Sequence, residues 1–540
     1  MIRGRALALL AALATAGVAA ESADLPDDAE LEAQGARIGT ITIRNLPIFD
    51  PRSPGESKSL FRLADRIHID TRASVIEAQL LFRSGDPFSR RVCDETERNL
   101  RELRFIKEPE IRVIGYHEGL VDLEVITHEV WTTNPGVSFG RAGGSNSTGF
   151  ELEELNLLGF GKYIALDYHD DVDRSSYTLT WRDPNVFGSR WRSAIELTDS
   201  DDGEGQALLF EQPFYALDSH WSAGLEIDHD DSVQGVYRLG REVDEYQQDA
   251  QIEDARIGWS KGLQAGWTRR WTAGLRHDET QFSEASRGTA FASLPDDRSL
   301  TYPYLRVERI QDDFETAQNL DQIARTEDLY FGIRYAIELG WAATAWGSDR
   351  NAALLRAEAS RGFRLGEGRS LFVDGGLASR FEEGSPHDAL FSGGLRYYRQ
   401  TSLQSTFFAS IAADVGHELD ADHELMLGGD NGLRGYPLRY QTGSGRAVMT
   451  IEQRFYTRYS LWKLADIGGA VFFDMGQTWG ESAFGPTENL GLLKDIGFGL
   501  RLGNTRSGLG NVIHLDIAFP LDGDRSISQA QFLVQTKRSF

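Results

Sequence analysis

The chain has 540 residues, of which 41% are hydrophobic and 26% are charged, a balance that excludes disorder along its whole length. Its formal net charge is −26, which disfavours a nucleic-acid partner because an acidic chain repels phosphate backbones. The 56 glycines and the aromatic content of 11% suit a β-rich protein.

The first twenty residues are expected to be a secretory signal peptide, 1–20. Arg3 and Arg5 precede a short apolar run, which ends at the small residues Val18-Ala19-Ala20. The run is too short to cross a bilayer as a helix. We therefore expect cleavage after Ala20 and a mature chain that works outside the cytoplasm.

Residues 36–131 combine strand and helix patterns. The segment 36–49 alternates as a strand does, and helical spacing begins at Ser74 and again over 90–103. Two further alternating segments follow. The order strand–helix–helix–strand–strand predicts a small α+β domain. Cys93, the only cysteine, falls in the second helix, so it forms no internal disulfide and is expected to be packed rather than reactive.

From residue 132 to residue 540 the helical period disappears and short alternating segments follow one another. In 511–519 the residues of one parity are apolar, and the other parity includes His514 and Asp516. In a soluble sandwich the polar parity would face water, whereas in a transmembrane barrel the apolar parity faces lipid and the polar parity lines a wet lumen. The segment 132–540 is too long for one sandwich, so we expect a closed barrel.

Tryptophans near the ends of the alternating segments stand where interface girdles require them. They are Trp181, Trp191, Trp221, Trp259, Trp271, Trp341, Trp462 and Trp479. At roughly 10 residues per strand plus turns, this region holds about 16 strands. A direct count of alternating segments gives about 18 to 20, some of which are expected to be hairpins within loops. The expected fold is a transmembrane antiparallel β-barrel of about 16 strands, preceded by the small α+β domain.

Four short motifs lie in the barrel region. They are ELNLLGFGK at 154–162, WRDPNVFG at 181–188, GLRGYP at 432–437 and VFFDMGQTW at 471–479. With the α+β domain, they resemble the superfamily of the outer-membrane barrel-assembly proteins BamA and TamA and the two-partner-secretion transporters, the bacterial surface antigen family. In this resemblance 36–131 is one POTRA (polypeptide-transport-associated) domain. The first two motifs resemble an early-barrel turn and an aspartate-proline strand end, and the last two resemble the sixth outer loop and a strand with a lumen-facing aspartate.

The resemblance implies that the loop around 432–437 folds back into the lumen and that Arg434 pairs with Asp474. The predicted loop motif is Gly432, Leu433, Arg434, Gly435 and Tyr436. The parity of the strand agrees: if Val471 faces lipid, then Asp474 faces the lumen. A buried arginine needs a nearby anion, and glycines let a loop pass close to a wall. The alternative is a surface loop with an exposed arginine.

The C-terminal residue Phe540 resembles the signal that barrel-assembly machinery reads on outer-membrane proteins. Phe532 and Val534 share its parity, whereas Arg538 departs from the usual apolar residue two places before the end.

No catalytic residue, metal site or cofactor is expected. The clusters His169-Asp170-Asp171 and Asp228-His229-Asp230-Asp231 contain ligands that suit a hard cation such as calcium, but acidic loop tips are normally solvated. We expect no GxSxG nucleophile elbow, which needs a strand-to-helix turn, because the helical period is absent from the barrel region. The chain has no phosphate-binding glycine loop. A hydrolase whose residues come from separate strands stays open as an alternative, because spacing does not reveal such a site.

By resemblance, the chain is expected to assist the insertion of proteins into the bacterial outer membrane or their translocation across it, with the POTRA-like domain in the periplasm. The expected partners are a client polypeptide, outer-membrane lipid and a periplasmic or inner-membrane protein. The seam between the first and last barrel strands, near 135–143 and 530–540, is expected to open. A single POTRA-like domain favours a specialised or accessory role over essential barrel assembly. A passive pore or a lipid-handling barrel is the alternative.

Overall fold

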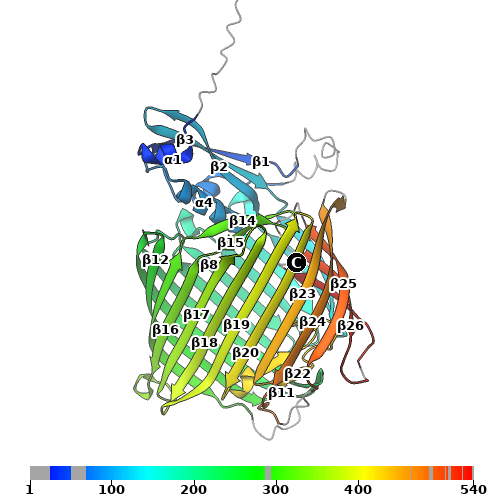
Figure 1. Cartoon of the computed structure of the whole chain (residues 1–540). Helices are drawn as coiled ribbons and strands as arrows, with labels where there is room; N and C mark the ends of the chain where they lie inside the picture. The colour runs from blue at the N-terminus through cyan, green and yellow to red at the C-terminus, as the bar shows by residue number, and fades with distance from the viewer. Residues whose placement is uncertain are drawn as a thin grey trace, which may run out of the picture.

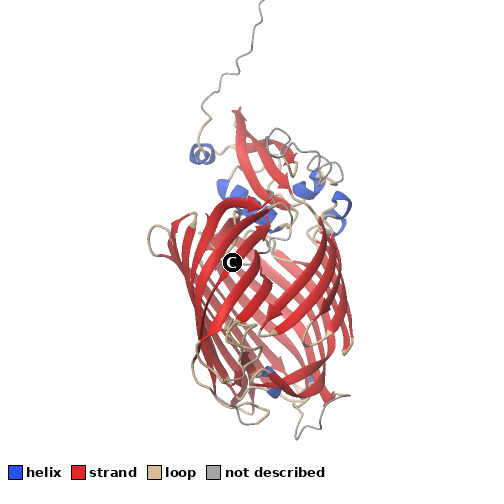
Figure 2. Ribbon diagram, turned by 90° about the vertical axis from the view of Figure 1, so that its right-hand side faces the viewer, coloured by secondary structure: helices blue, strands red, loops and turns tan. Residues whose placement is uncertain are grey.

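The computed structural model describes residues 25–49, 68–285, 294–461, 464–485, 490–504, 506, 508, 512–525 and 527–537. The expected signal peptide, Trp462, Arg538 and Phe540 lie outside these residues. The described chain forms a small α+β domain seated over one end of a closed barrel (Figures 1 and 2). We call this end of the barrel the domain end and the opposite end the far end. None of the described helices has the length and apolar character needed to cross a bilayer.

The small domain has its elements in the predicted order after a first helix, α1, that the sequence analysis did not predict. They are α1 (Asp28–Ala33), β1 (Arg37–Leu46), α3 (Ala73–Glu77), α4 (Arg90–Glu102), β2 (Ile106–His117) and β3 (Leu120–Glu129). The sheet order is β1-β3-β2, with β1 parallel and β2 antiparallel to β3. The helix expected from Ser74 is shorter than predicted: it ends at Glu77 because the chain then turns to bury Leu80 and Phe82 in the domain core.

The closed antiparallel barrel that the alternation predicts is confirmed, but the expected number of about 16 strands is wrong. Within the described residues the barrel has 20 strands. They are β4 (Thr133–Ala142), β5 (Ser145–Glu154), β6 (Tyr163–Asp170), β7 (Ser175–Asp183), β8 (Arg192–Ser200), β9 (Gly203–Gln212), β10 (Trp221–Arg238), β11 (Arg241–Gln264), β12 (Trp267–Glu284), β13 (Arg298–Gln311), β16 (Ile333–Ala342), β17 (Ala352–Arg364), β18 (Arg369–Glu382), β19 (Ser385–Ser402), β20 (Ser405–His417), β23 (Gly445–Leu461), β24 (Ala465–Trp479), β25 (Leu493–Asn504), β26 (Val512–Pro520) and β27 (Gln531–Lys537).

The difference in strand number comes from the connections. Several barrel hairpins turn in two residues, such as Leu239-Gly240 between β10 and β11 and Ala265-Gly266 between β11 and β12. Leu239 and Gly240 have φ of 49° and 73°, the left-handed pair that a tight hairpin turn requires. Because these turns use so little chain, more strands fit than an average allowance for loops predicts.

Some alternating segments are loop hairpins, as the sequence predicts. One is β14 (Phe314–Gln318) with β15 (Thr326–Tyr330) at the domain end, and the other is β21 (Leu425–Leu427) with β22 (Gln441–Gly443) at the far end (Figure 1). Four short 3-10 helices complete the described elements. They are η1 (Leu157–Gly159), η2 (Val186–Gly188), η3 (Thr344–Trp346) and η4 (Ala421–His423).

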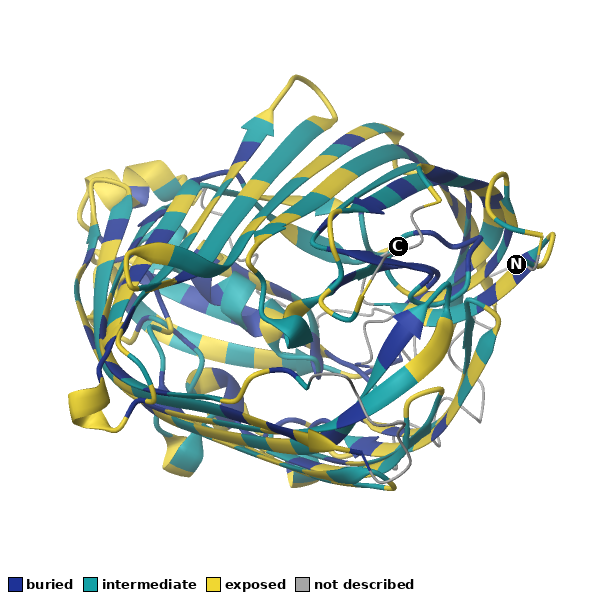
Figure 3. Ribbon diagram, turned by 90° about the horizontal axis from the view of Figure 1, so that it is seen from below, coloured by how far each residue is buried: buried dark blue, intermediate teal, exposed yellow. Residues whose placement is uncertain are grey.

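Barrel side chains alternate between an apolar outer face and a polar inner face. On β25, Ile496, Phe498 and Leu500 are about half exposed on the outside, whereas Asp495 and Arg501 are fully buried inside. Figure 3, which looks into the far end, shows the same alternation as stripes along the strands. This is the pattern of a barrel in lipid.

Tryptophans mark the outer face at the domain end. Trp221, Trp259 and Trp271 are register partners on three successive strands, and the rings of Trp259 and Trp271 stack with centroids 6.3 Å apart. Trp341 lies at the end of β16 that points to the far end and is 51% exposed. These positions match the two girdles that the sequence predicts.

The barrel closes between β27 and β4 through a single register pair, Val534 with Arg141, within the described residues. Every other pair of neighbouring barrel strands has seven or more register pairs, as β26 and β27 do. Among the described residues, the closure therefore has far fewer register pairs than any other part of the wall.

Candidate functional site

A loop enters the lumen from the far end between β21 and β22. It carries the predicted motif, and its turn is held by backbone hydrogen bonds from Leu433 N–H to Gly428 O at 2.9 Å and from Tyr436 N–H to Leu433 O at 3.0 Å. The short β21–β22 sheet closes the base of the loop. The loop therefore has an internal structure that presents one face to the barrel wall.

Arg434 lies on that face and contacts Asp474 of β24. Its Nε donates to Asp474 Oδ2 at 2.7 Å and its Nη2 donates to Oδ1 at 2.9 Å, a two-pronged arrangement that lysine does not reproduce. Thr450 Oγ1 also donates to Asp474 Oδ1, at 2.8 Å. The guanidinium carbon lies 3.3 Å from the ring centroid of Phe472. Arg434 is 7% exposed and Asp474 is fully buried, so these charges neutralise each other away from bulk water.

Three further charged residues extend the pair into a cluster on the inner wall. Arg434 Nη1 lies 3.8 Å from Glu452 and 3.7 Å from Asp516, and Arg501 contacts both of these carboxylates. All belong to the inward parity of β23, β25 and β26. The sequence analysis did not single them out, because a polar residue of inward parity is common along a barrel and only the closed sheet shows which of them meet.

Asp495 is the register partner of Asp474 across β24 and β25. It is fully buried, and neither of its carboxylate oxygens has a hydrogen-bond partner in the described structure. A side chain at Gly435 would put its Cβ 2.6 Å from Asp495 Cβ, so the loop backbone passes directly against this acid. Two adjacent buried carboxylates give the wall a strong local preference for the cation of the loop.

The other residues of the motif fasten the loop by packing. Gly432 has a φ of 131°, and a Cβ there would lie 2.6 Å from Val448 Cγ2. Leu433 and Tyr436 are fully buried. Tyr436 also donates its hydroxyl to Lys494 O at 2.7 Å. All five predicted loop residues therefore touch or closely approach the wall.

The same loop reaches the outer turns on the side of the closure. Arg439 Nη1 donates to Asp173, between β6 and β7, at 2.6 Å, and its guanidinium lies 4.3 Å from the ring centroid of Tyr237. A Cβ on Gly143, in the β4–β5 turn, would lie 2.2 Å from Leu438 N. The loop thus joins β24 to the first hairpins of the barrel at the far end.

A second insertion enters from the domain end, and the sequence analysis missed it. Residues 312–332 connect β13 to β16, and the turn of the β14–β15 hairpin reaches the opposite wall. Asp321 accepts hydrogen bonds from Arg454 Nη1 and from the Tyr398 hydroxyl, both at 2.8 Å. Tyr456 donates its hydroxyl to Leu320 O at 2.8 Å.

Apolar contacts seat the hairpin turn further. Ile323 is 3% exposed and forms a buried cluster with Tyr456, Ala470 and Val512. A Cβ on Gly503 would lie 2.7 Å from Ile323 Cβ, so the wall has no side chain where the turn lands. The wall therefore contacts this turn through both hydrogen bonds and apolar packing, as it contacts the far-end loop.

The hairpin also binds the small domain. Arg101 of α4 grips Asp328 with two hydrogen bonds, both 2.7 Å. Thr326 donates its hydroxyl to Glu108 of β2 at 2.6 Å. The guanidinium of Arg98 lies 3.9 Å from the ring centroid of Phe314. The hairpin therefore links the small domain to the opposite wall of the barrel at the domain end. A movement of the small domain would pull on the hairpin.

The side chain of Glu327 holds the backbone of the hairpin turn. It accepts hydrogen bonds from the N–H groups of Leu320 and Asp321, both at 2.9 Å. Burial, with a smaller contribution from Asp321, raises the pKa of Glu327 to about 7. The turn thus contains a group that titrates near neutral pH.

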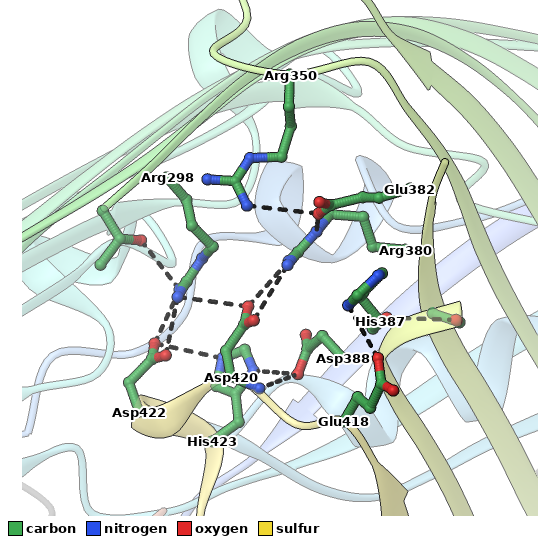
Figure 4. Close-up of polar contacts among 12 residues, drawn as sticks. Arg298, Arg350, Arg380, Glu382, His387, Asp388, Glu418, Asp420, Asp422 and His423 are labelled. Atoms are coloured by element: carbon green, nitrogen blue, oxygen red, sulfur yellow. Dashed lines mark hydrogen bonds and ion pairs between the residues drawn. The ribbon is translucent and has the colours of Figure 1, made fainter. Parts of the chain in front are cut away.

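A polar network covers part of the far end (Figure 4). The carboxylate of Asp420 accepts from Arg380 at 2.9 and 3.0 Å, and Arg298 holds Asp422 at 2.8 Å. His423 lies 2.8 Å from Asp388. Ligand-type atoms of Asp388, Asp420 and His423 lie within 4.8 Å of one another, as a metal ion would require. Arg380 already neutralises Asp420, and His423 pairs with Asp388, so the arrangement serves as an ion-pair network.

The other predicted residues are placed as follows. His169 contacts Asp171 at 3.2 Å and His229 contacts Asp249 at 3.0 Å, each as a single pair. Phe532 is 57% exposed on the outer face. Val534 lies at the closure, and Phe540 is outside the described residues.

The motifs at 154–162 and 181–188 form matching turns at the domain end. Each contains a short 3-10 helix, and Leu158 and Phe187 take left-handed φ values of 54° and 53°. Cys93 is 1% exposed in the core of the small domain, and burial raises the pKa of its thiol to about 12, so it stays protonated and unreactive.

No protein-family model matches the chain, and no curated protein matches it. Several solved structures are similar to it. CdiB from Escherichia coli is similar over 93% of this chain and 76% of its own, with 13% identity and a TM-score of 0.48. CdiB from Acinetobacter baumannii is similar over 94% of this chain and 74% of its own, with 12% identity and a TM-score of 0.45. BamA from Haemophilus ducreyi, lacking POTRA domains 1–3, is similar over 93% of this chain and 85% of its own, with 13% identity and a TM-score of 0.37.

Proposed function

We propose that this protein is an outer-membrane barrel that inserts polypeptides into the outer membrane or moves them across it. The apolar outer face and the tryptophan girdles support a position in lipid. The motif resemblance supports the outer membrane, with the small domain in the periplasm and the far end outside the cell. The client is a polypeptide in an extended form.

The observation that carries the proposal is the closure between β27 and β4. A strand edge with unpaired backbone groups is a template for another strand, and only Val534 and Arg141 are paired across this closure in the described structure. Parting it would expose two edges inside the plane of the membrane, where an incoming strand could satisfy its own backbone groups. A barrel that only conducts small solutes has no use for such an edge.

The two insertions support a resting state in which the lumen is blocked. The loop around Arg434 occupies the far end and is held to the wall by a buried ion pair. The hairpin at 312–332 occupies the domain end and is held by a partly buried ion pair. A client would have to displace at least one of them. The link between the hairpin and α4 provides a route by which binding at the small domain loosens the hairpin.

The small domain is proposed as the receptor for the client or for a partner protein. Its sheet order leaves β1 and β2 as edge strands, and either can pair with an added strand. One domain of this kind presents fewer edges than a chain of several. We therefore propose a specialised or accessory role in place of general barrel assembly.

A disulfide across the closure tests the proposal. Arg141→Cys with Val534→Cys joins two directly opposed residues, whose Cα separation of about 4.5–5.5 Å in an antiparallel pair suits a disulfide. The matched control joins Leu152→Cys to Leu166→Cys across β5 and β6, away from the closure. Cys93 is buried and stays out of both bridges.

The readout is the abundance of outer-membrane and secreted proteins in cells of the source bacterium that produce only the variant. We expect the oxidised closure variant to lose function by about tenfold or more, with recovery on reduction, and the control to remain active. Full activity of the oxidised closure variant would contradict the proposal. Steady conductance that neither the bridge nor deletion of residues 36–131 alters would favour a passive pore.

A further inference from the structure

A cavity of 790 Å³ lies beneath the small domain at the mouth of the barrel. Its walls come from α4, from the turns before β8 and β10, from the β14–β15 hairpin and from the inner ends of β13 and β16. A second cavity of 390 Å³ adjoins it. Glu102, Leu103, Pro184 and Arg192 line both cavities, so the two lie side by side as adjoining lobes.

The larger lobe is cationic in a chain that is strongly acidic. Acidic residues outnumber basic ones by 82 to 56 overall, yet five arginines and only three acids line this lobe. The arginines are Arg98, Arg190, Arg192, Arg270 and Arg334. Two of the acids are already neutralised: Glu95 is held by Arg91 at 2.9 Å and Asp328 by Arg101 at 2.7 Å. Three of the arginines are paired as well, Arg192 with Glu211, and Arg270 and Arg334 with Glu308. This leaves Arg98 and Arg190 against one acid, Glu102, so a small excess of positive charge remains.

Two of these arginines have no carboxylate within ion-pair distance among the described residues. The guanidinium of Arg98 lies over Phe314, and that of Arg190 lies 4.5 Å from the ring centroid of Tyr215 while Nη2 donates to Leu80 O at 2.7 Å. Burial lowers the pKa of Arg190 from its ordinary value, which shows that its positive charge is poorly compensated. A guanidinium group without a carboxylate partner suits a phosphate, which it binds through two parallel hydrogen bonds.

The smaller lobe is mainly apolar. Its lining includes Leu103, Phe105, Leu155, Ala194 and Leu209. A cationic lobe joined to an apolar one fits a molecule with an anionic head and a hydrocarbon tail. A free phosphate would leave the second lobe empty, and an acidic peptide would leave its backbone groups without partners there.

We propose that this two-lobed cavity binds an anionic phospholipid, with the phosphate between Arg98 and Arg190 and an acyl chain along Leu103 and Leu209. Its position favours a lipid source, because the turns that form its walls also form the rim of the barrel. Phe187 of one such turn is fully exposed and Leu158 of another is 57% exposed, as expected of residues that dip into the adjoining leaflet. The inference does not depend on a client or on transport.

Photo-crosslinking of the purified full-length protein in dodecyl maltoside tests the site. The probe is a phosphatidylglycerol that carries a diazirine on one acyl chain, and mass spectrometry locates the labelled peptides. We expect label on the peptides that contain Leu103 and Leu209. Unlabelled phosphatidylglycerol should compete for these positions, and inorganic phosphate or phosphatidylcholine at the same concentration should not.

Two variants and one matched control complete the experiment. Arg98→Gln with Arg190→Gln should reduce labelling of both peptides about tenfold, because a charge-assisted pair is lost. Leu209→Trp should reduce it by filling the apolar lobe. The control, Arg369→Gln with Arg399→Gln, removes two exposed arginines of the same barrel rim that line neither cavity. Heat-modified mobility on gels checks that each barrel is folded.

Three outcomes would overturn the inference. One is undiminished labelling in the Arg98 and Arg190 double variant while its barrel is folded. Another is labelling confined to outward-facing barrel residues. The third is competition by inorganic phosphate as strong as that by phosphatidylglycerol, which would reduce the site to an anion site without an acyl-chain lobe. None of these outcomes bears on the disulfide test of the barrel closure.

Discussion

Arg434 and Asp474 are separated by 40 residues in the chain, yet the guanidinium of one grips the carboxylate of the other through two hydrogen bonds inside the barrel. The arginine comes from a loop that enters at the far end, and the aspartate comes from the wall. Because both side chains are buried, water does not take the place of the lost partner when one of them is removed. The pair therefore fastens the loop to a strand of the barrel wall.

Removal of the loop cation should destabilise the barrel. Arg434→Ala leaves Asp474 and the neighbouring Asp495 buried without their cation, and the loss of one partner of a buried pair costs about 3–5 kcal/mol. We expect a clear drop in the temperature at which the barrel shifts mobility on gels. Arg434→Lys should recover only part of it, since lysine lacks the two-pronged geometry.

The control for this prediction is Asp230→Ala, which removes an exposed acid on β10 that forms no ion pair in the described structure. We expect a shift of less than about 0.5 kcal/mol, as for most surface substitutions. If Asp230→Ala and Arg434→Ala lowered the transition equally, the loop would have no special role in stability.

The hairpin at 312–332 should shield the inner wall beneath it. Ala470 is 4% exposed under Ile323, so a cysteine at this position reports on the hairpin. In the Ala470→Cys background, Asp321→Ala removes the partner of Arg454 and Tyr398. We expect labelling by a soluble maleimide to accelerate about tenfold, because hydrogen bonds to a charged group are lost.

Asp374→Ala provides the comparison, because it removes an acid of β18 that makes no contact with the hairpin in the described structure. Its labelling rate should equal that of the parent. Equally slow labelling in the Asp321→Ala protein would show that something other than the hairpin covers Ala470.

The hairpin should respond to pH through Glu327. Because burial raises its folded pKa to about 7, above the ordinary value of 4.5, the turn gains stability while Glu327 is protonated and loses it as the pH rises through 7. Labelling of Ala470→Cys, corrected for thiolate content with an unfolded standard, should be about tenfold faster at pH 8 than at pH 6.

Glu327→Gln should remove this dependence, since an amide does not titrate. Its corrected labelling rate should stay low at both pH values. A pH dependence that persists in Glu327→Gln would place the titrating group elsewhere.

The far-end network should respond to pH in the same direction through His423. The hydrogen bond with Asp388, aided by the charge of Asp422 and opposed by burial and by Arg298, raises the pKa of His423. The charged histidine therefore stabilises the η4 segment below its ordinary pKa of 6.5, and this stabilisation is lost as the pH rises through the higher folded pKa. We expect proteolysis within 418–424 to be slower at pH 5.5 than at pH 8.5.

His423→Gln should abolish the difference between the two pH values after correction for the activity of the protease. His220→Gln, at the other end of the barrel, should leave it intact. An unchanged pH difference in His423→Gln would assign the effect to another group, such as His387 beside Glu418.

Local pattern was sufficient for the faces of the strands. The parity of 511–519 predicts which residues face lipid, and Ile513 and Phe519 are exposed while His514 and Asp516 are buried. A strand alternates with a period of two wherever it lies, so this information is contained in the residues themselves. The contact of Arg434 with Asp474 was accessible only through resemblance to a motif, because no spacing rule links a loop to a strand 40 residues away.

Local pattern was insufficient for the number of strands and for the second insertion. The segments of β14 and β15 alternate as barrel strands do, and only pairing with each other shows that they leave the wall. Asp321 carries no signal of its own, because its partners Arg454 and Tyr398 lie on strands far along the chain.

The sequence by itself determined a barrel with an apolar exterior, a polar interior and a small α+β domain before it, because periodicity and composition are local properties. The tertiary structure alone decided that a loop enters the lumen from each end, that Asp495 lies beside Asp474, and that one register pair closes the wall among the described residues. Those features depend on which strands become neighbours. Register and closure set that choice, and they are properties of the whole sheet.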